Sequence, residues 1–283
     1  MKARAAVLFE PGNNLEICDV TVQDPGPGEV RVKMVAAGVC HTDLSVIKGN
    51  VPAPMPIVPG HEGAGIVHDV GIGVTSLKPG DHVIPLWRLS CGECELCSGG
   101  RPALCAEGSQ VRSTGRLLDG TSRFDLDGRE ILHFCGVSSF ADFTVMPQRQ
   151  LLKIPMDLSL EKAALLGCAV ITGVGAVVSS AKVRLGSTVA VFGAGGVGVN
   201  IIQGAKLAGA RMIIAVDQHS DRLGDAKTFG ATHLINASTG DTSAEIRKLT
   251  AGIGVDYAFE AIGLKPTIEQ AYDCLAKLHL YII

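Results

Sequence analysis

Short apolar runs separated by polar turns dominate the first half of the chain. Residues 5–9 and 30–35 are examples, and Asp-Pro-Gly-Pro-Gly at 24–28 is a strong turn signal between them. Many short strands joined by Gly/Pro turns indicate a small barrel or sandwich. Residues 108–134 are polar and irregular, which predicts a surface excursion. Further short strands are expected at 63–74, 82–84 and 140–145.

From about residue 160 the apolar runs become continuous and alternate with helical segments. Residues 161–180 suit a helix that carries Cys168. The uncharged runs 188–192 and 212–216 are typical of buried parallel strands. A doubly wound sheet built from two mononucleotide halves needs a further unit, so this sheet is predicted to be incomplete at the C-terminus. Other strands are expected at 233–235 and 255–259, and helices at 199–207, 221–229 and 266–277.

Composition and charge narrow the class of protein. Of the 283 residues, 47% are hydrophobic and 19% charged, enough apolar material for one large domain or two ordinary ones. The formal net charge is -3 and no dense Lys/Arg run occurs, so neither nucleic acid nor an anionic membrane is an expected partner. Residues 163–181 are long enough to span a bilayer, but their many Gly, Ala, Ser and Thr residues favour a helix packed inside a soluble protein. The N-terminal apolar run stops at Glu10, too early for a secretion signal, which favours the cytoplasm.

Four of the nine cysteines are close together in the sequence. Their spacing is C-x2-C-x2-C-x7-C, and they are Cys91, Cys94, Cys97 and Cys105. In a reducing compartment such a set binds zinc more readily than it forms disulfides. Four thiolates around Zn2+ make a closed tetrahedral site, so its role would be structural. The alternative is four unpaired thiols in a loop.

The segment 40–62 holds the best candidates for catalytic chemistry. Cys40 and His61 are residue types that bind zinc. Thr42 and Asp43 could serve a reacting alcohol and a ligating imidazole. A catalytic zinc site needs three protein ligands, and this segment offers two. The sequence therefore predicts a third ligand elsewhere, and a cofactor that accepts the group that the metal helps to release from the substrate.

A glycine-rich turn directly follows the apolar run 188–192. It has the pattern G-x-G-x-x-G and consists of Gly193, Ala194, Gly195, Gly196, Val197 and Gly198. The pattern alone is weak evidence, but here it stands between a strand and a helix, and Asp217 ends the next strand. Such a turn binds a dinucleotide pyrophosphate, and Asp217 would accept hydrogen bonds from the adenosine ribose and repel a 2′-phosphate, which favours NAD over NADP. The alternative is a tight structural turn before a solvated aspartate.

Three features coincide in this chain: the segment from Cys40 to Glu62, the four-cysteine cluster, and the turn 193–198 followed by Asp217. Together they resemble the zinc-dependent alcohol dehydrogenases of the medium-chain dehydrogenase/reductase superfamily, over essentially the whole chain. Residues 120–124 are most similar to the liver-type and class III-like (glutathione-dependent formaldehyde dehydrogenase) subgroup. The resemblance implies a GroES-like, β-rich catalytic domain at 1–155, which includes a structural zinc lobe. It also implies an NAD-binding Rossmann domain, a doubly wound parallel sheet, at 156–283.

The resemblance supplies the missing zinc ligand. In the family a Gly-Cys motif lies on the helix before the dinucleotide fold, and Gly167-Cys168 matches it. Cys40, His61 and Cys168 would then hold a catalytic zinc whose fourth position is open. Without the resemblance, Cys168 would be interpreted as a buried, inert thiol.

Further positions take their roles from the resemblance alone. Thr42 matches the residue that hydrogen-bonds the substrate oxygen. Asp43 matches the acid that orients the ligating histidine, and Glu62 matches the acid close behind the zinc. His41 and Arg222 match basic residues near the coenzyme pyrophosphate and the adenosine ribose.

The substrate pocket shows one match and several departures. Trp87 falls where an aromatic wall narrows the pocket. Ser45 stands where many members have the histidine that ends the proton relay. Val51 and Ser109 stand where glutathione-dependent members have an acid and an arginine, which argues against a glutathione adduct as substrate.

The resemblance implies transfer of a hydride between a primary or secondary alcohol and NAD, giving an aldehyde or ketone and NADH, with two zinc ions per chain. Two alternatives stay open: a thiol-dependent formaldehyde dehydrogenase, and a truncated zinc-binding chain without activity. The second alternative follows because family members continue past Ile283. Their usual dimer-forming segment also lies beyond that residue, so the homo-oligomer of the family is not expected to carry over directly.

Overall fold

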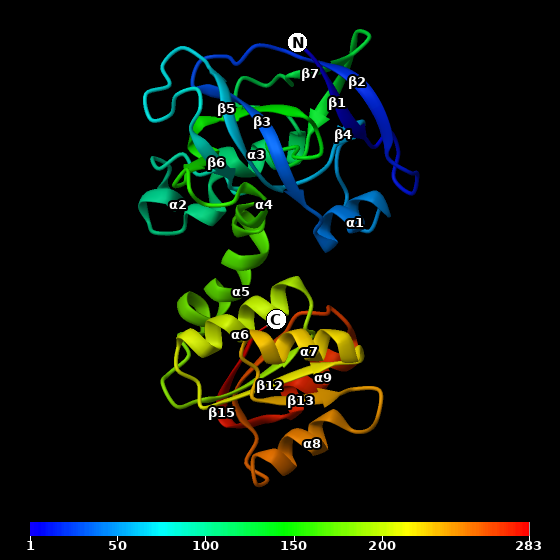
Figure 1. The fold of residues 1–283 in the computed structure, drawn as a ribbon, viewed down its shortest axis with the longest axis vertical. Helices are drawn as coiled ribbons and strands as arrows, with labels where there is room; N and C mark the ends of the chain where they lie inside the picture. Colours follow the sequence, from blue (N-terminus) through cyan, green and yellow to red (C-terminus); the bar gives the residue numbers. More distant parts are fainter. Residues whose placement is uncertain (283) are drawn as a thin grey trace. The chain divides into compact units, whose positions relative to one another are not determined.

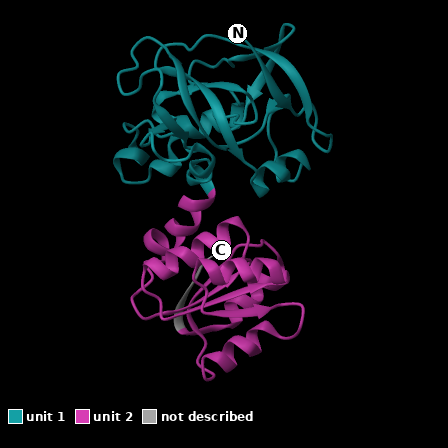
Figure 2. Cartoon of the chain, in the orientation of Figure 1, with its two compact units in different colours: residues 1–168 teal, residues 169–283 magenta. Residues whose placement is uncertain are grey.

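The computed structural model describes residues 1–282, and Ile283 lies outside them. Contacts divide the chain into two compact units, residues 1–168 and 169–283 (Figure 2). The division falls inside a helix, whereas the predicted domain boundary lies between residues 155 and 156. Both divisions place the four-cysteine cluster in the first unit and the glycine-rich turn in the second.

Unit 1 is built on two five-stranded, mainly antiparallel sheets, with strand orders β1-β2-β7-β8-β4 and β10-β6-β5-β3-β9 (Figure 1). In the second sheet Val30 and Val32 of β3 are fully buried in one cluster with Val67 of β5 and Val83 of β6. This β-rich architecture confirms the predicted fold class of the first half. The strands are β1 (Lys2–Val7), β2 (Glu16–Val22), β3 (Glu29–Gly38), β4 (Ile57–Val58), β5 (Glu62–Val70), β6 (His82–Pro85), β7 (Phe124–Leu126), β8 (Arg129–His133), β9 (Phe143–Pro147) and β10 (Leu151–Lys153).

The helices that lie wholly within unit 1 are short. They are α1 (His41–Ile47), α2 (Glu95–Ser98), α3 (Ala106–Thr114), α4 (Leu160–Ala163) and the 3-10 turns η1 (Pro102–Leu104) and η2 (Gln148–Gln150). Neither α2 nor η1 buries a residue. The segment that carries the four cysteines therefore has little apolar core of its own.

The prediction of a surface excursion at 108–134 is wrong. Helix α3 and the antiparallel pair β7–β8 occupy most of this segment, and β7 also pairs with β2. Phe124 and Ile131 are buried in the core of the sheet. The polar composition misled because some of the charged residues are internal. Arg123 is 7% exposed, and its guanidinium donates hydrogen bonds of 2.8 and 2.9 Å to Glu29.

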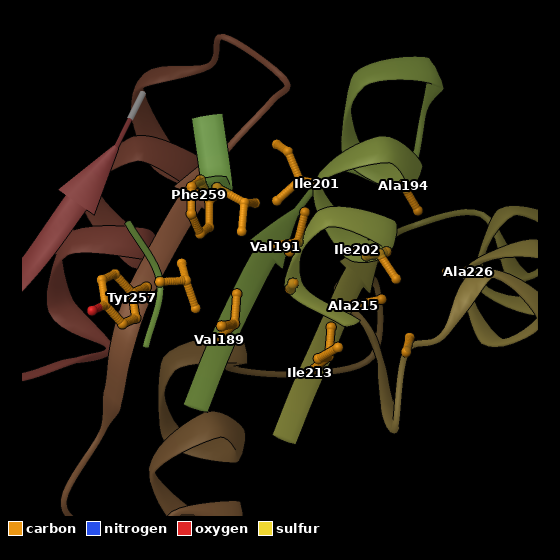
Figure 3. Close-up of a cluster of buried hydrophobic side chains, with 14 of the residues drawn as sticks. Val189, Val191, Ala194, Ile201, Ile202, Ile213, Ala215, Ala226, Tyr257 and Phe259 are labelled. Carbon is orange, nitrogen blue, oxygen red and sulfur yellow. The ribbon is translucent and has the colours of Figure 1, made fainter. Parts of the chain in front are cut away.

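Unit 2 is one parallel sheet covered by helices on both faces, with strand order β13-β12-β11-β14-β15. One face buries Val189 and Val191 against Ile202 of α6 (Figure 3). The other face buries Ala190 and Phe192 among residues that include those of α8 and α9. Because both faces are covered, β11 shows no alternation of apolar and polar residues, as predicted. The strands are β11 (Thr188–Phe192), β12 (Met212–Asp217), β13 (His233–Asn236), β14 (Val255–Glu260) and β15 (Leu275–Ile282), and the helices are α6 (Gly196–Leu207), α7 (Ser220–Phe229), α8 (Thr242–Leu249) and α9 (Lys265–Asp273).

Two elements of unit 2 differ from the sequence prediction. The helix predicted at 266–277 ends at Asp273, and the chain turns at Cys274 directly into β15, which runs parallel to β14. No glycine or proline marks this turn, so the pattern gave no stop signal. Helix α8 was not predicted, although Asp241 caps it by accepting a hydrogen bond from the N–H of Ala244 at 3.1 Å.

One continuous helical run, Leu160–Ala181, ends unit 1 and begins unit 2. After α4 it continues as the π-helical turn η3 (Leu166–Val170), α5 (Ile171–Gly175) and a second π-helical turn, η4 (Ala176–Ala181). Its 22 residues are long and apolar enough to cross a membrane by length and composition, and 33% of its most apolar window is buried. Within unit 2, α5 contacts α6, and Val177 is fully buried in the core.

The buried His133 makes the stability of unit 1 sensitive to pH. Its side chain is 1% exposed, and its Nε2 accepts a hydrogen bond from the backbone N–H of Arg123 at 3.2 Å. Burial, assisted by the charge of Arg123, lowers the pKa of His133 to about 3. Between that value and the pKa of about 6.5 in the unfolded chain, only the unfolded state binds the proton. His133 therefore makes the folded state less stable as the pH falls below 6.5.

We expect the variant His133→Gln, which keeps a hydrogen-bond acceptor, to lose this part of the pH dependence. The free energy of unfolding of the parent chain should fall by about 1 kcal/mol per pH unit more steeply than that of the variant between pH 6 and pH 4. Denaturant midpoints measured across this range test the prediction. Parallel pH profiles for the two proteins would contradict it.

Candidate active site

The turn from β3 into α1 organises the first cluster of functional side chains. Cys40 is the N-cap of α1, and the carboxylate of Asp43 accepts a hydrogen bond from the Cys40 N–H at 3.1 Å. The same carboxylate accepts from the N–H of Gly60 at 3.1 Å and lies 3.0 Å from Nδ1 of His61. Asp43 is 0% exposed and thus fixes both ends of the segment 40–61 relative to each other. With Nδ1 held by Asp43, Nε2 of His61 is left to act as a ligand.

Cys168 reaches this cluster from the far end of unit 1. It lies on the π-helical turn η3, a local distortion that often occurs at functional positions. A Cβ on its neighbour Gly167 would lie 2.5 Å from the carbonyl oxygen of Pro85, so the close approach of η3 to the end of β6 requires glycine at this position. The predicted Gly-Cys motif thus has a steric reason for the glycine as well as a chemical reason for the cysteine.

The donor atoms gathered here suit zinc. Side-chain donors of Cys40, His61, Glu62 and Cys168 all lie within 4.8 Å of one another. Two sulfur ligands and one imidazole are a known donor set for catalytic zinc. A carboxylate oxygen of Glu62 belongs to this group of donor atoms and could act as a further ligand. The structure brings the predicted ligands together, and their assignment to a metal stays a prediction.

The protonation of the cluster shows how closely its members interact. The hydrogen bond from Cys168 lowers the pKa of Cys40 to about 3, against the effect of burial, and the same bond raises the pKa of Cys168. Burial disfavours a charged His61, but the hydrogen bonds and charges of Asp43 and Cys40 outweigh it and raise its pKa to about 10. Burial, followed by the charge of Cys40, raises the pKa of Glu62 to about 7. A metal that binds here must displace protons from this set.

Aromatic side chains flank the cluster within unit 1. The imidazole of His61 stands edge-on to Trp87, with 6.2 Å between ring centroids, and edge-on to Phe134, at 5.6 Å. His41 and Thr42 are exposed at the first turn of α1, next to the predicted ligand Cys40. Apolar rings and a hydroxyl are the side-chain types that a pocket for a small alcohol requires.

The second cluster consists of the four cysteines predicted to hold a structural zinc. Sulfur atoms of Cys91, Cys94, Cys97 and Cys105 all lie within 4.8 Å of one another. The sulfur of Cys91 accepts hydrogen bonds from the N–H groups of Glu93 and Cys94 at 3.5 and 3.3 Å. Cys105 is similarly approached by the N–H of Cys91 at 3.3 Å. The donor set fits a closed tetrahedral zinc site.

The glycine-rich turn lies between β11 and α6 of unit 2. A Cβ on Gly198 would lie 1.7 Å from the carbonyl oxygen of Gly193, so this position requires glycine. Nothing lies within 4 Å of a Cβ built on Gly195, the N-cap of α6, and no side chain caps the helix. The first N–H groups of α6 are thus open to an anion, as expected for the pyrophosphate of a dinucleotide.

Asp217 lies at the carboxyl end of β12, next to this turn. It is 5% exposed, and its two oxygens accept hydrogen bonds from the N–H groups of Ala194 and His219 at 2.9 and 3.0 Å. Nη1 of Arg222 lies 3.9 Å from the carboxylate. Two carboxylate lone pairs remain for ribose hydroxyls. The structure thus places Asp217 as predicted, and its contact with a coenzyme stays a prediction.

Sequence reasoning missed Glu260, which shapes the same end of the sheet. Its buried carboxylate accepts hydrogen bonds from the N–H of Gly263 at 3.0 Å and from the hydroxyl of Thr267 at 2.7 Å. The N–H of Ala261 donates to the carbonyl of Phe192 at 2.9 Å, so the loop held by Glu260 borders the glycine-rich turn. An acid at the carboxyl end of a predicted parallel strand was the signal that could have found it.

Comparison with known proteins agrees with this geometry. Residues 26–156 match the family model for the alcohol dehydrogenase GroES-like domain, and residues 196–278 match the model for zinc-binding dehydrogenases. The S-(hydroxymethyl)glutathione dehydrogenase of Escherichia coli O139:H28 is 44% identical over 280 residues, which cover 96% of this chain and 75% of that protein.

Solved structures of dehydrogenases are similar to this chain over its whole length. An alcohol dehydrogenase zinc-binding domain protein from Burkholderia ambifaria superposes with a TM-score of 0.93 at 40% identity, over 100% of this chain and 76% of the other. Benzyl alcohol dehydrogenase from Acinetobacter calcoaceticus superposes with a TM-score of 0.92 at 37% identity, over 100% and 77%. The chain belongs to the zinc-dependent alcohol dehydrogenases of the medium-chain dehydrogenase/reductase superfamily.

Proposed function

We propose that this protein transfers a hydride between a small alcohol and NAD, with one catalytic and one structural zinc ion per chain. The observation that carries the proposal is the convergence of Cys40, His61 and Cys168, which come from three separate segments of unit 1. A chance cluster of buried residues would rarely unite two thiols and an imidazole that is itself held by a buried carboxylate. The glycine-rich turn with Asp217 supplies the second half of the reaction, a site for a dinucleotide.

The roles of the side chains follow from their positions. When bound, zinc supplies Lewis acidity toward the alcohol oxygen, and NAD supplies the hydride acceptor. Asp43 holds the ring of His61 through Nδ1, which fixes the direction in which Nε2 points. The exposed hydroxyl of Thr42 accepts the proton of the alcohol and passes it toward solvent. Trp87 and Phe134 restrict water around His61 and orient the carbon chain of the substrate.

The direct test is NADH formation with a panel of primary and secondary alcohols, together with zinc content. We expect two zinc ions per chain and absorbance of NADH that depends on the alcohol. A chain that binds two zinc ions and NAD but oxidises no alcohol in the panel would overturn the proposal.

A second candidate is oxidation of an adduct between formaldehyde and a thiol. It is favoured by the relatives at 44% identity that are named S-(hydroxymethyl)glutathione dehydrogenase. Against it, Val51 and Ser109 offer no charge to the glutathione carboxylates, although Arg112 lies one turn along α3 and its Nη2 is 3.4 Å from the Ser109 hydroxyl. Formaldehyde oxidation measured with and without glutathione separates the two candidates, because only the adduct reaction requires the thiol.

The choice of NAD over NADP rests on Asp217. We expect Asp217→Asn, which removes the negative charge and keeps one acceptor, to raise the KM for NAD by about 10-fold and to narrow the preference for NAD over NADP. KM values for both coenzymes measure this. The control is Asp225→Asn on α7, an exposed carboxylate outside the turn, which should leave both values unchanged. An unaltered coenzyme preference in Asp217→Asn would contradict the assignment.

We infer that the protein works in a reducing compartment, the cytoplasm. All nine cysteines are free thiols. Both candidate zinc sites need cysteines in the reduced form, because the thiolate is the ligand. Oxidising compartments would favour disulfides within the segment that carries four of them.

A further inference from the structure

Trp87 is the only tryptophan of the chain, and it stands beside the candidate catalytic centre. Its ring is half-buried and edge-on to the imidazole of His61. Rotation of the indole would change the space next to this ligand. If the proposed function holds, the orientation of Trp87 would affect which substrates fit. The ring packs against the buried cluster that includes Phe134, and a polar side chain covers it as well.

Arg88 is the side chain that lies over the indole. Its Cζ is 4.3 Å from the centroid of the Trp87 ring, within the range of a cation–π contact. Its Nη1 donates a hydrogen bond of 3.0 Å to the carbonyl oxygen of Ala103. Among the residues that the structure describes, no carboxylate forms a salt bridge with Arg88. The indole and one backbone carbonyl are thus its recorded partners.

The carbonyl that anchors Arg88 belongs to the four-cysteine lobe, which we define as residues 91–105. Ala103 lies in η1, two residues before the predicted ligand Cys105. Since α2 and η1 bury no residue, the position of Ala103 depends on the metal cluster rather than on an apolar core. Arg88 therefore connects an element fixed by one metal cluster to an aromatic ring beside the other.

The chemistry of arginine suits this connection. A planar guanidinium can cover an aromatic face and at the same time donate in its own plane to a carbonyl. A lysine could satisfy one of these contacts but not both. Burial, followed by the charge of Arg112, lowers the pKa of Arg88, so the group is partly removed from water, where cation–π attraction is strongest.

We propose that Arg88 is a positioning residue that couples the backbone of the four-cysteine lobe to the orientation of Trp87, and so sets substrate preference at the catalytic centre. The proposal rests on the proposed function for its effect on substrates. Its structural half, the coupling of the lobe to Trp87, stands independently of that function.

Arg149 provides a matched control. Its Nη1 donates a hydrogen bond of 2.9 Å to the carbonyl oxygen of Cys91, at the other end of the lobe, and its Nη2 lies 3.2 Å from Glu93. No cation–π contact joins it to Trp87 among the described residues. Arg149→Met thus removes an arginine–lobe hydrogen bond without touching the indole, whereas Arg88→Met removes both contacts.

The experiment uses the full chain loaded with zinc and compares the parent protein with Arg88→Met, Arg88→Lys and Arg149→Met. Zinc content and Trp87 fluorescence, including quenching by acrylamide, are measured first. The second measurement is the ratio of kcat/KM for benzyl alcohol to kcat/KM for ethanol, with kcat and KM also given separately for each substrate. For Arg88→Met we expect two zinc ions per chain, increased quenching of Trp87, and a change of about 5-fold in the ratio, carried mainly by KM.

Arg88→Lys should change the quenching of Trp87 and the substrate ratio in the same direction as Arg88→Met, but by a smaller amount. If Arg88→Met does not fold, Arg88→Lys alone tests the proposal. Arg149→Met should leave the quenching and the substrate ratio at the parent values. Unchanged quenching in both Arg88 variants, or an equal change in Arg149→Met, would overturn the proposal. If no alcohol is oxidised, the proposed function fails, while the quenching comparison still tests the coupling of the lobe to Trp87.

Discussion

Replacing Cys168 by alanine is expected to remove one of two zinc ions per chain and to abolish alcohol oxidation. Cys168 shares a largely buried cluster with Cys40, His61 and Glu62, and the donor atoms of the four residues lie within 4.8 Å of one another. Without its thiolate, zinc would have one sulfur and one imidazole, with only Glu62 to complete the set. That set would bind zinc less tightly, because one of the two thiolate ligands is lost.

We expect kcat/KM to fall by at least about 1,000-fold, because the Lewis acidity of the metal supplies several kcal/mol of transition-state stabilisation. Zinc content by elemental analysis and NADH formation measure the two effects together. Cys274→Ala is the matched control, since Cys274 is also a buried cysteine but lies outside both clusters. Its thiol donates a hydrogen bond to the carbonyl oxygen of Ala271. Full turnover in Cys168→Ala, or two zinc ions per chain, would refute the assignment.

The dinucleotide turn could be predicted because all of its information is local. β11, the turn 193–198, α6 and β12 follow one another directly, and each has its own signal in the sequence. The buried strand is a continuous apolar run, and the turn needs glycine where its backbone segments almost touch. The acid Asp217 then follows at the end of the next strand, at the spacing that the fold imposes.

The metal centre could be predicted only in part, because its donors come from distant segments. Cys40 and His61 are linked in the sequence by a short segment, and the buried Asp43 joins its two ends. Cys168 has no such neighbour, and its identity as a ligand came from the resemblance to a family. The close approach of η3 to Pro85, which brings Cys168 into the cluster, is a tertiary contact that no periodicity encodes.

The segment 108–134 shows why polar composition misleads. Arg123 and His133 are residue types usually found at the surface, yet both are buried, at 7% and 1% exposure. They are tolerated because Glu29 pairs with the guanidinium and because the imidazole stays neutral. The partner of Arg123, Glu29, lies on a strand that is distant in the sequence. The sequence alone therefore could not show that this segment is part of the core.

Replacing Cys97 by serine is expected to remove the other zinc ion and to unfold the four-cysteine lobe. α2 and η1 contribute no buried residue, and Leu104 is 52% exposed, so hydrophobic burial contributes little to the order of the lobe. Metal coordination is then its main source of stability, as in small zinc modules. We expect a loss of at least about 3 kcal/mol in the free energy of unfolding, with cleavage by proteases concentrated between residues 91 and 105.

Ser98→Ala is the matched control for this prediction, because it lies in the same lobe and contributes no thiolate. Its hydroxyl donates to the carbonyl oxygens of Cys94 and Glu95 at 3.1 and 3.3 Å, bonds whose loss costs about 1 kcal/mol or less at an exposed site. Elemental analysis should find one zinc ion per chain in Cys97→Ser and two in Ser98→Ala, with limited proteolysis distinguishing the two variants in the same way. If Cys97→Ser keeps both zinc ions and resists proteolysis like the parent chain, the lobe is not organised by metal. The anchor of Arg88 at Ala103 must then be held by the polypeptide alone, and the link between the lobe and Trp87 would not depend on zinc.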